Sequence, residues 1–156
     1  RGTPRRRDPH NTGSRADPRG RRWVVKGLPR PSGARRCVQA GAAAVWVSNH
    51  GGRQLDRTLA TAACLAEVAA EVRGEAEVYV DGGVRSGLDV LAGLALGADA
   101  VFLGRLPLYA LVEGEAGVAA MHEELRVQTA EAFRLAGSRT VADCRDLAEL
   151  GAGSLP

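Results

Sequence analysis

Isoleucine is absent from this chain of 156 residues, and lysine occurs only once, at position 26. Cysteine is scarce as well: Cys37, Cys64 and Cys144 are far apart and show no Cys-x-x-Cys spacing. Neither a disulfide framework nor a zinc site is therefore indicated, and we expect no metal. No uninterrupted apolar run approaches the roughly 18 residues of a membrane helix, and no signal-peptide pattern precedes the motifs described below. The reducing cytoplasm is the expected location.

Aromatic residues are few, and the strongly basic first part of the chain has none. Residues 1–22 contain eight arginines against two aspartates, whereas the remainder carries 13 basic and 16 acidic residues. Because this segment also lacks apolar periodicity, we expect residues 1–22 to be a disordered basic extension and residues 151–156 to be a flexible tail. An arginine-rich segment can bind nucleic acid, but this one offers no aromatic ring for base stacking, so we expect no such partner.

Four short apolar segments share one design, since each ends in glycine, a charged residue or both. Lys26, Ser48, Asp81 and Gly104 mark their ends and follow one another at intervals of 22, 33 and 23 residues. Such intervals are typical of repeated strand–helix units. The expected strands lie at about 23–27, 45–47, 78–80 and 101–103.

Stretches rich in alanine and leucine separate these segments and have helical character. They cover roughly 32–41, 58–73 and 86–97, and a further helical stretch at 115–149 is expected to serve packing only. Alternation of this kind predicts the α/β class with a parallel sheet and helical crossovers. The carboxyl ends of parallel strands lie at the same edge, so the polar motifs should meet on one rim.

Residues 48–53, after the second segment, read Ser-Asn-His-Gly-Gly-Arg. An imidazole that can accept a proton near neutral pH, His50, lies three residues from a guanidinium that can hold a carboxylate by two hydrogen bonds, Arg53. This pair suits proton abstraction next to a carboxylate. The alternative is a purely structural loop.

Two later motifs favour an anion site. Gly82 and Gly83 allow the backbone to approach an anion closely, a helix beginning near Ser86 contributes its positive end, and Arg85 contributes a full charge. Gly104 and Arg105 repeat this chemistry after the next strand. The alternative is a pair of tight turns with solvated arginines.

Taken in this order and spacing, the motifs resemble the FMN-dependent α-hydroxy acid oxidase/dehydrogenase family, the glycolate oxidase and L-lactate dehydrogenase type. The resemblance runs from about residue 23 to 149 and implies the C-terminal half of a (β/α)8 TIM barrel, as a domain at 23–150. Because a complete barrel takes about 250 residues, we expect the chain to be a fragment, a truncated product or a mis-started translation.

The resemblance implies FMN as cofactor and oxidation of a small 2-hydroxy acid to the 2-oxo acid. It assigns the role of catalytic base to His50, which also contacts substrate, and that of carboxylate clamp to Arg53. Lys26 would lie at the flavin N1/O2 edge and Ser48 against the flavin ring. The ribityl chain and phosphate would be held by the two glycine-rich motifs, namely Asp81, Gly82, Gly83, Val84, Arg85, Gly104 and Arg105.

The family draws further substrate-positioning tyrosines, and an aspartate that pairs with the histidine, from the half that has no counterpart here. A half barrel also leaves its outer strands unpaired, so we expect self-association, a separate N-terminal half or aggregation. The alternative function is an inactive or partner-requiring remnant that at most binds FMN or phosphate. Phosphate barrels of the inosine monophosphate dehydrogenase type rely on a cysteine loop that is not found in this sequence. The electron acceptor, whether oxygen, quinone or cytochrome, stays open.

Overall fold

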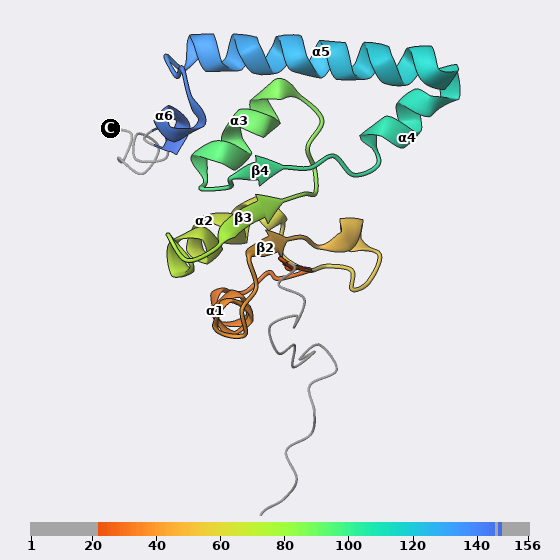
Figure 1. Cartoon of the computed structure of the whole chain (residues 1–156). Coiled ribbons are helices and arrows are strands. Elements are labelled where there is room, and N and C mark those ends of the chain that lie inside the picture. Colours follow the sequence, from red (N-terminus) through yellow and green to blue (C-terminus); the bar gives the residue numbers. More distant parts are fainter. Residues whose placement is uncertain (1–21, 146, 148–156) are drawn as a thin grey trace, which may run out of the picture.

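The structure is a computed structural model, and it describes residues 22–145 and 147. Apart from Arg22, the expected basic extension lies outside these residues, as do the expected tail at 151–156 and the end of the expected helical stretch at 115–149. Within the described part, strands and helices alternate along the chain (Figure 1). The α/β class is therefore confirmed.

Four parallel strands form one sheet in the order β1-β2-β3-β4. They are β1 (Val24–Lys26), β2 (Ala44–Val47), β3 (Glu77–Val80) and β4 (Ala100–Val101). The crossovers are α1 (Pro31–Gln39), α2 (Thr61–Glu71) and α3 (Gly87–Ala95), and a 3-10 turn, η1 (His50–Gly52), follows β2. All four expected strands and all three expected crossover helices are present.

The two faces of the sheet differ in what covers them. Valines of β2 and β3 that point to one side are buried with α1 and α2 in the main core, which includes Val45, Val47, Val78, Val80, Leu65 and Val68. Trp46 and Tyr79, which alternate with these valines, stay partly exposed, and Trp46 is paired in register with both Lys26 and Tyr79. The ring centroids of Trp46 and Phe102 are 4.1 Å apart, so an aromatic row runs across this second face.

The last part of the chain that the structure describes differs from the single helical stretch expected at 115–149. It forms α4 (Leu106–Ala110), η2 (Leu111–Glu113), α5 (Gly114–Leu135) and α6 (Val141–Arg145). Gly137, at φ +72°, stops α5, because Ser138 N–H donates to the Phe133 carbonyl at 3.0 Å and Gly137 N–H to the Arg134 carbonyl at 3.1 Å. This left-handed glycine cap satisfies the last carbonyls and redirects the chain. The helical pattern of the sequence had predicted one stretch here, without a break at Gly137.

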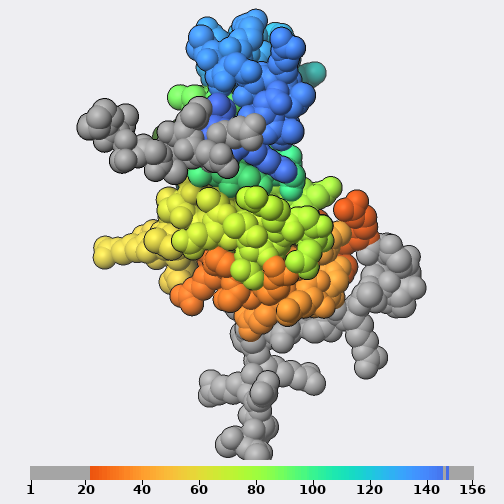
Figure 2. Space-filling view, turned by 90° about the vertical axis from the view of Figure 1, so that its left-hand side faces the viewer, coloured from red at the N-terminus to blue at the C-terminus, as the bar shows by residue number. Residues whose placement is uncertain are grey.

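Helix α5 packs across α3 at a point that requires glycine. A Cβ added at Gly87 would lie 2.2 Å from the backbone of α5 at Gln128 and Thr129, so only glycine allows this approach. Leu91, Leu94, Ala132 and Cys144 form a second core there. Figure 2 shows the α5–α6 segment (blue) above the α1–α2 segment, with the exposed residues 53–60 (yellow) projecting from the body.

Strand β4 is shorter than expected and ends at Val101 rather than Leu103. Phe102 N–H still donates to the Val80 carbonyl at 2.8 Å, but no strand lies beyond β4 among the described residues to extend the ladder. No helix in residues 22–145 combines the length and the hydrophobicity that a bilayer crossing requires.

Candidate active site at the carboxyl ends of the strands

A rim of polar residues lies where the strands end, on the side toward which the arrows point in Figure 1. Lys26 is the last residue of β1, Ser48 follows β2 and Asp81 follows β3. Asp81 N–H still donates to the Val47 carbonyl at 3.2 Å, which keeps the two loops in register as they leave the sheet. The parallel topology thus places the sequence motifs at one edge, as expected.

The histidine turn is held by its own side chains. His50 N–H donates to Ser48 Oγ at 3.1 Å, and Gly51 N–H donates to Asn49 Oδ1 at 3.0 Å. His50 itself has φ +53°, a left-handed conformation that is uncommon for any residue with a side chain. Such a conformation persists when the surrounding structure imposes it, and it is often found at functional sites.

The imidazole of His50 lies against the backbone of the neighbouring loop. A Cβ added at Gly27 would be 2.8 Å from His50 Cε1, and Gly27 itself has φ +90°. The absence of a side chain at position 27 therefore makes room for the imidazole. This contact joins the end of β1 to the turn after β2.

An ion pair crosses the sheet beneath this turn. Lys26 Nζ donates to Asp81 Oδ2, and the Asp81 side chain is only 12% exposed. The same ammonium lies 4.1 Å from the centroid of the Trp46 ring, a favourable cation–π arrangement. The chain's one lysine is thus fixed between a carboxylate and an aromatic face, at the carboxyl end of the sheet.

The glycine-rich loop after β3 presents backbone donors. Gly82 and Gly83 have φ +101° and +86°. Among the residues that the structure describes, the N–H groups of Gly82, Gly83 and Val84 have no acceptor. An anion at this loop would therefore meet three free donors.

The first turn of α3 is largely occupied by its own cap. The Asp89 carboxylate accepts from Arg85 N–H and Ser86 N–H, both at 2.9 Å, while Ser86 Oγ accepts from Asp89 N–H. Burial raises the pKa of the Asp89 carboxyl, but these hydrogen bonds and the charge of Arg85 together hold it below its usual value. The helix end contributes less to an anion site than the sequence suggested, because a carboxylate already lies there.

The three arginines of the rim are placed differently. The Arg105 guanidinium lies over the histidine turn, since a Cβ added at Gly51 would be 3.5 Å from its Nη2. Arg53 and Arg85 are exposed, and their guanidinium groups make no hydrogen bond or ion pair with any described residue. The structure therefore brings together His50, Lys26, Asp81, Gly82 and Arg105, with Ser48 supporting the turn, but does not bring Arg53 or Arg85 into contact with them.

Two residues of this rim had no role assigned from the sequence. Asn49 lies against Gly82, whose added Cβ would be 3.2 Å from Asn49 Oδ1, and so it links the loops after β2 and β3. Thr61 donates to the Gly82 carbonyl at 3.3 Å. Asn49 stands inside the histidine motif and could have been suspected, whereas nothing in the sequence pairs Thr61 with Gly82.

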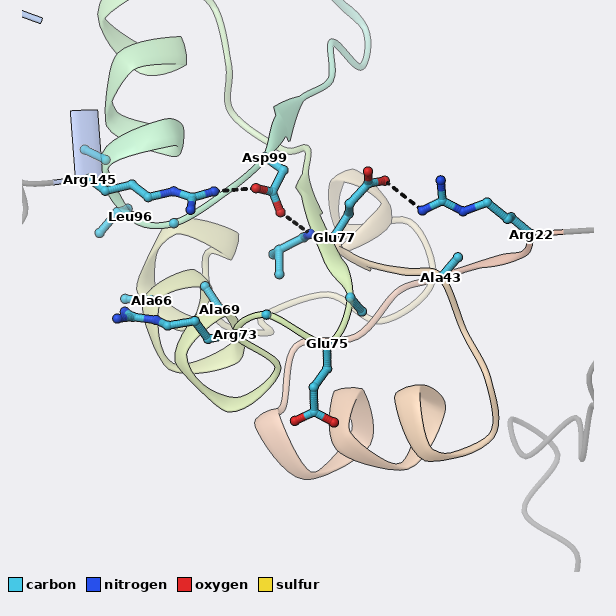
Figure 3. Close-up of a pocket in the computed structure, with 15 residues that line it drawn as sticks. Arg22, Ala43, Ala66, Ala69, Arg73, Glu75, Glu77, Leu96, Asp99 and Arg145 are labelled. Carbon is cyan, nitrogen blue, oxygen red and sulfur yellow. Dashed lines mark hydrogen bonds and ion pairs between the residues drawn. The ribbon is translucent and has the colours of Figure 1, made fainter. Parts of the chain in front are cut away.

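A separate hollow of about 640 Å³ lies at the opposite, amino ends of the strands. Figure 3 shows its charged lining, where Asp99 accepts from Arg145 and from Val78 N–H and Glu77 lies beside Arg22. It contains none of the residues singled out from the sequence. Because its carboxylates are paired and barrel enzymes carry their chemistry at the carboxyl ends of the strands, we regard the rim as the candidate site. No cluster of potential metal ligands occurs in the described part of the chain.

Comparisons with known proteins show which family this chain resembles. The family model for "FMN-dependent dehydrogenase" matches residues 16–149. The L-lactate dehydrogenase of Stenotrophomonas maltophilia (strain K279a) is 48% identical over 121 residues, which are 77% of this chain and 32% of that protein. Glycolate oxidase 3 of Oryza sativa subsp. indica is 46% identical over 121 residues, again 77% of this chain and 33% of that protein.

Solved structures also resemble this chain. A mandelate oxidase crystallised with (S)-2-phenylpropionate has a TM-score of 0.77 at 46% identity, over 80% of this chain and 37% of that one. A lactate oxidase from Pediococcus acidilactici has a TM-score of 0.82 at 39% identity, over 89% of this chain and 39% of that one. The chain spans about a third of the length of the curated relatives that it matches. Its four strand–helix units accordingly represent part of a TIM barrel.

Proposed function

This chain belongs to the FMN-dependent dehydrogenase family, whose members oxidise α-hydroxy acids, and we propose that its rim binds FMN and a small 2-hydroxy acid and oxidises that acid to the 2-oxo acid. One observation carries the proposal. Loops from all four strands meet at the rim: His50 packs against Gly27, Arg105 lies over Gly51 and Asn49 lies against Gly82. Residues separated by up to 78 positions thus surround one turn with a proton acceptor at its centre.

The loops fit the phosphate end of FMN. Gly82, Gly83 and Val84 offer backbone N–H groups that lack acceptors among the described residues, and the left-handed glycines leave the loop open to an anion. Arg85 and Arg105 would add positive charge, and Asp81 and Gly104 would hold the ribityl chain. FMN, when bound, supplies the two-electron acceptor for the substrate's α-carbon.

Lys26 would stabilise negative charge at the N1/O2 edge of the flavin. The ion pair with Asp81 and the Trp46 ring hold its ammonium in one place, so the charge needs no reorganisation during the reaction. Ser48 would contact the flavin ring. Its hydroxyl also accepts from His50 N–H, so one residue would serve both the cofactor and the base.

His50 would accept a proton from the substrate at a ring nitrogen, either the hydroxyl proton or the α-proton. Such transfer by a positioned side chain contributes about 10²–10⁴-fold to rate. Arg53, at the end of the same turn, would hold the substrate carboxylate by two parallel hydrogen bonds. Because both groups belong to one short turn, the position of the carboxylate determines which substrate atoms face the imidazole.

The exposure of Arg53 favours a second candidate, a chain that binds FMN or phosphate but needs further residues to oxidise substrate. Arg53 and the whole segment 53–60 are exposed, and Val24 on the open face of the sheet is 45% exposed. A partner chain, or a second copy of this one, would then complete the substrate pocket. Neither candidate function specifies the electron acceptor, because access of an acceptor to the flavin depends on surfaces beyond these loops.

An anaerobic absorbance experiment separates the two candidates. The purified chain is reconstituted with FMN, and spectra are recorded before and after L-lactate, glycolate and mandelate are added together. Bleaching of the flavin band that is lost in His50→Ala, with FMN still bound, supports oxidation at this rim. A protein-bound flavin spectrum that no substrate bleaches supports the binding-only candidate, and a free-FMN spectrum contradicts both for this chain by itself.

A further inference from the structure

Thr61 is a buried polar residue that its own helix does not use. It is the first residue of α2 and only 3% exposed, whereas the N-cap position is Ala60, which makes no side-chain cap. A threonine near a helix start commonly accepts a hydrogen bond from the first turn. Here its hydroxyl instead donates to the Gly82 carbonyl at 3.3 Å, 21 residues away in sequence.

This hydrogen bond fixes the orientation of one peptide group. In a trans peptide, the carbonyl of one residue and the N–H of the next point in opposite directions. None of the described peptide bonds is cis. With the Gly82 carbonyl held toward α2, the N–H of Gly83 must point away from α2.

The other side of Gly82 is fixed as well. A Cβ added at Gly82 would lie 3.1 Å from Thr61 Oγ1 and 3.2 Å from Asn49 Oδ1, so the two side chains enclose its Cα. Asn49 is itself held by Gly51 N–H. The freedom that Gly82 would give this loop is therefore reduced by contacts from α2 and from the histidine turn, whereas an added Cβ at Gly83 would have nothing within 4 Å.

From this geometry we infer that Thr61 is a positioning residue for the anion site, holding the Gly82–Gly83 peptide so that the Gly83 N–H is presented to the phosphate group of the ligand. The inference rests on the proposed function for the identity of the phosphate, since it takes FMN as the natural ligand. Thr61 does not itself contact the anion. Its effect is to remove, before binding, the conformational freedom of a loop that binding would otherwise have to restrict.

The test compares three threonine variants of the full chain. Thr61→Val keeps the shape and removes the hydroxyl, whereas Thr61→Ser keeps the hydroxyl and removes the methyl group. Thr129→Val is the matched control, because Thr129 Oγ1 also donates to a carbonyl, that of Leu125 at 2.7 Å, but this hydrogen bond lies within α5 and does not involve Gly82 or Gly83. FMN dissociation constants come from quenching of flavin fluorescence, and far-ultraviolet circular dichroism with thermal melts establishes that each variant is folded.

We expect FMN binding about three- to tenfold weaker in Thr61→Val, as for the loss of one hydrogen bond. Thr61→Ser should bind within about twofold of the parent chain, and Thr129→Val should bind like it. Equal affinity in Thr61→Val and the parent chain would overturn the inference. So would equal weakening in Thr61→Ser and Thr61→Val, because the methyl group and not the hydroxyl would then matter.

A second readout is independent of the flavin. In ¹⁵N-labelled chain titrated with inorganic phosphate, the Gly83 amide signal should shift in the parent chain and in Thr61→Ser, and less in Thr61→Val. A chain that fails to bind FMN but shows this pattern would contradict the proposed function and leave the role of Thr61 supported. A Gly83 amide that ignores phosphate in the parent chain would overturn the inference itself.

Discussion

The two ends of the four-stranded sheet carry the same residue types, arginines, carboxylates and left-handed glycines, but hold them differently. At the amino ends, carboxylates are used up by partners: Asp99 accepts from Val78 N–H at 2.8 Å and from Arg145, and Glu77 lies 3.8 Å from Arg22. At the carboxyl ends, Arg53 and the N–H groups of Gly82 and Gly83 have no partner among the described residues.

This difference indicates which groups stabilise the fold and which are available to bind a ligand. A paired group at the amino ends contributes to folding and has little left to offer a ligand. An unpaired donor at the carboxyl ends contributes nothing to folding and is available to an anion. Two left-handed glycines also differ: Gly74 at the amino end has nothing within 4 Å of an added Cβ, whereas an added Cβ at Gly27 at the carboxyl end would meet His50.

The largest expected effect comes from substituting Gly27, the glycine that lies against His50. Gly27→Ala should lower substrate turnover about 100-fold, because its Cβ would meet His50 Cε1 at 2.8 Å and displace the imidazole. Gly74→Ala is the matched control, with φ +78° against +90° for Gly27. Both should lose about 1–3 kcal/mol of stability to backbone strain, measured by urea unfolding. Equal turnover in the two variants would mean that His50 does not depend on this contact.

Removing a paired carboxylate at the amino ends of the strands should change the stability of the fold alone. Asp99→Ala removes the acceptor of Val78 N–H, which belongs to a buried residue, and should lower the free energy of unfolding by about 2 kcal/mol. FMN affinity should stay unchanged, because the change lies at the far end of the sheet. Glu123→Ala, which breaks an exposed pair with Arg126, should have little effect on either quantity. A loss of FMN affinity in Asp99→Ala would show that the ends are coupled.

Arg53 offers a sharper test of the rim, since the role proposed for it concerns substrate and its side chain is exposed. Arg53→Lys keeps the charge but loses the bidentate geometry, so KM for the hydroxy acid should rise about tenfold with an unchanged melting temperature. Arg57→Lys, in the same exposed loop, is the control and should leave KM unchanged. Anaerobic dye reduction at several substrate concentrations measures KM for both variants. If the two variants have the same KM, Arg53 is not the clamp.

The smallest effect concerns acid stability. The pKa of Asp89 is lower in the folded chain than its ordinary value of 3.8, so its stabilising contribution is present above about pH 4 and is lost as the pH falls through the folded value. Asp89→Asn should cost about 1 kcal/mol at pH 7 through the weakened helix cap, and this difference should shrink toward pH 2. Urea unfolding at pH 7, 5, 4, 3 and 2 tests this, and parallel curves for the two proteins would contradict it.

Asp143 provides the same motif elsewhere. N–H donation from Arg139 and Thr140 and the Thr140 hydroxyl hold the pKa of Asp143 below its usual value, at the start of α6. Asp143→Asn should therefore flatten the acid limb of the stability curve in the same direction as Asp89→Asn. An opposite slope in either variant would contradict the capping explanation.

Much of the fold could be predicted because its signals are local. Alternation of valine-rich strands with alanine-rich helices indicated four parallel units, and glycine or charge at each strand end indicated the rim. The division of the final stretch into α5 and α6 was not predicted, although Gly137 is a typical signal for the end of a helix. The length of β4 could not be predicted, because a strand extends only as far as its neighbours pair with it.

The candidate site was predicted in outline. His50, Lys26, Asp81 and the glycines were expected at one rim and are found there, while their roles remain proposals. The ion pair of Lys26 with Asp81, the approach of Arg105 to Gly51 and the hydrogen bond of Thr61 to Gly82 were not foreseen. Each joins residues at least 21 positions apart, and no spacing rule specifies which side chains meet across separate loops.

The sequence by itself determined the class of fold, the order of the strands and the chemical types gathered at their ends, because periodicity and turn residues act over a few positions. The tertiary structure alone decided which of these groups are used up and which are free. Asp81 is paired and Arg53 is exposed, although both are charged residues in short motifs after strands. The reason is that pairing depends on distances between loops, and those are set only when the helices pack the strands into register.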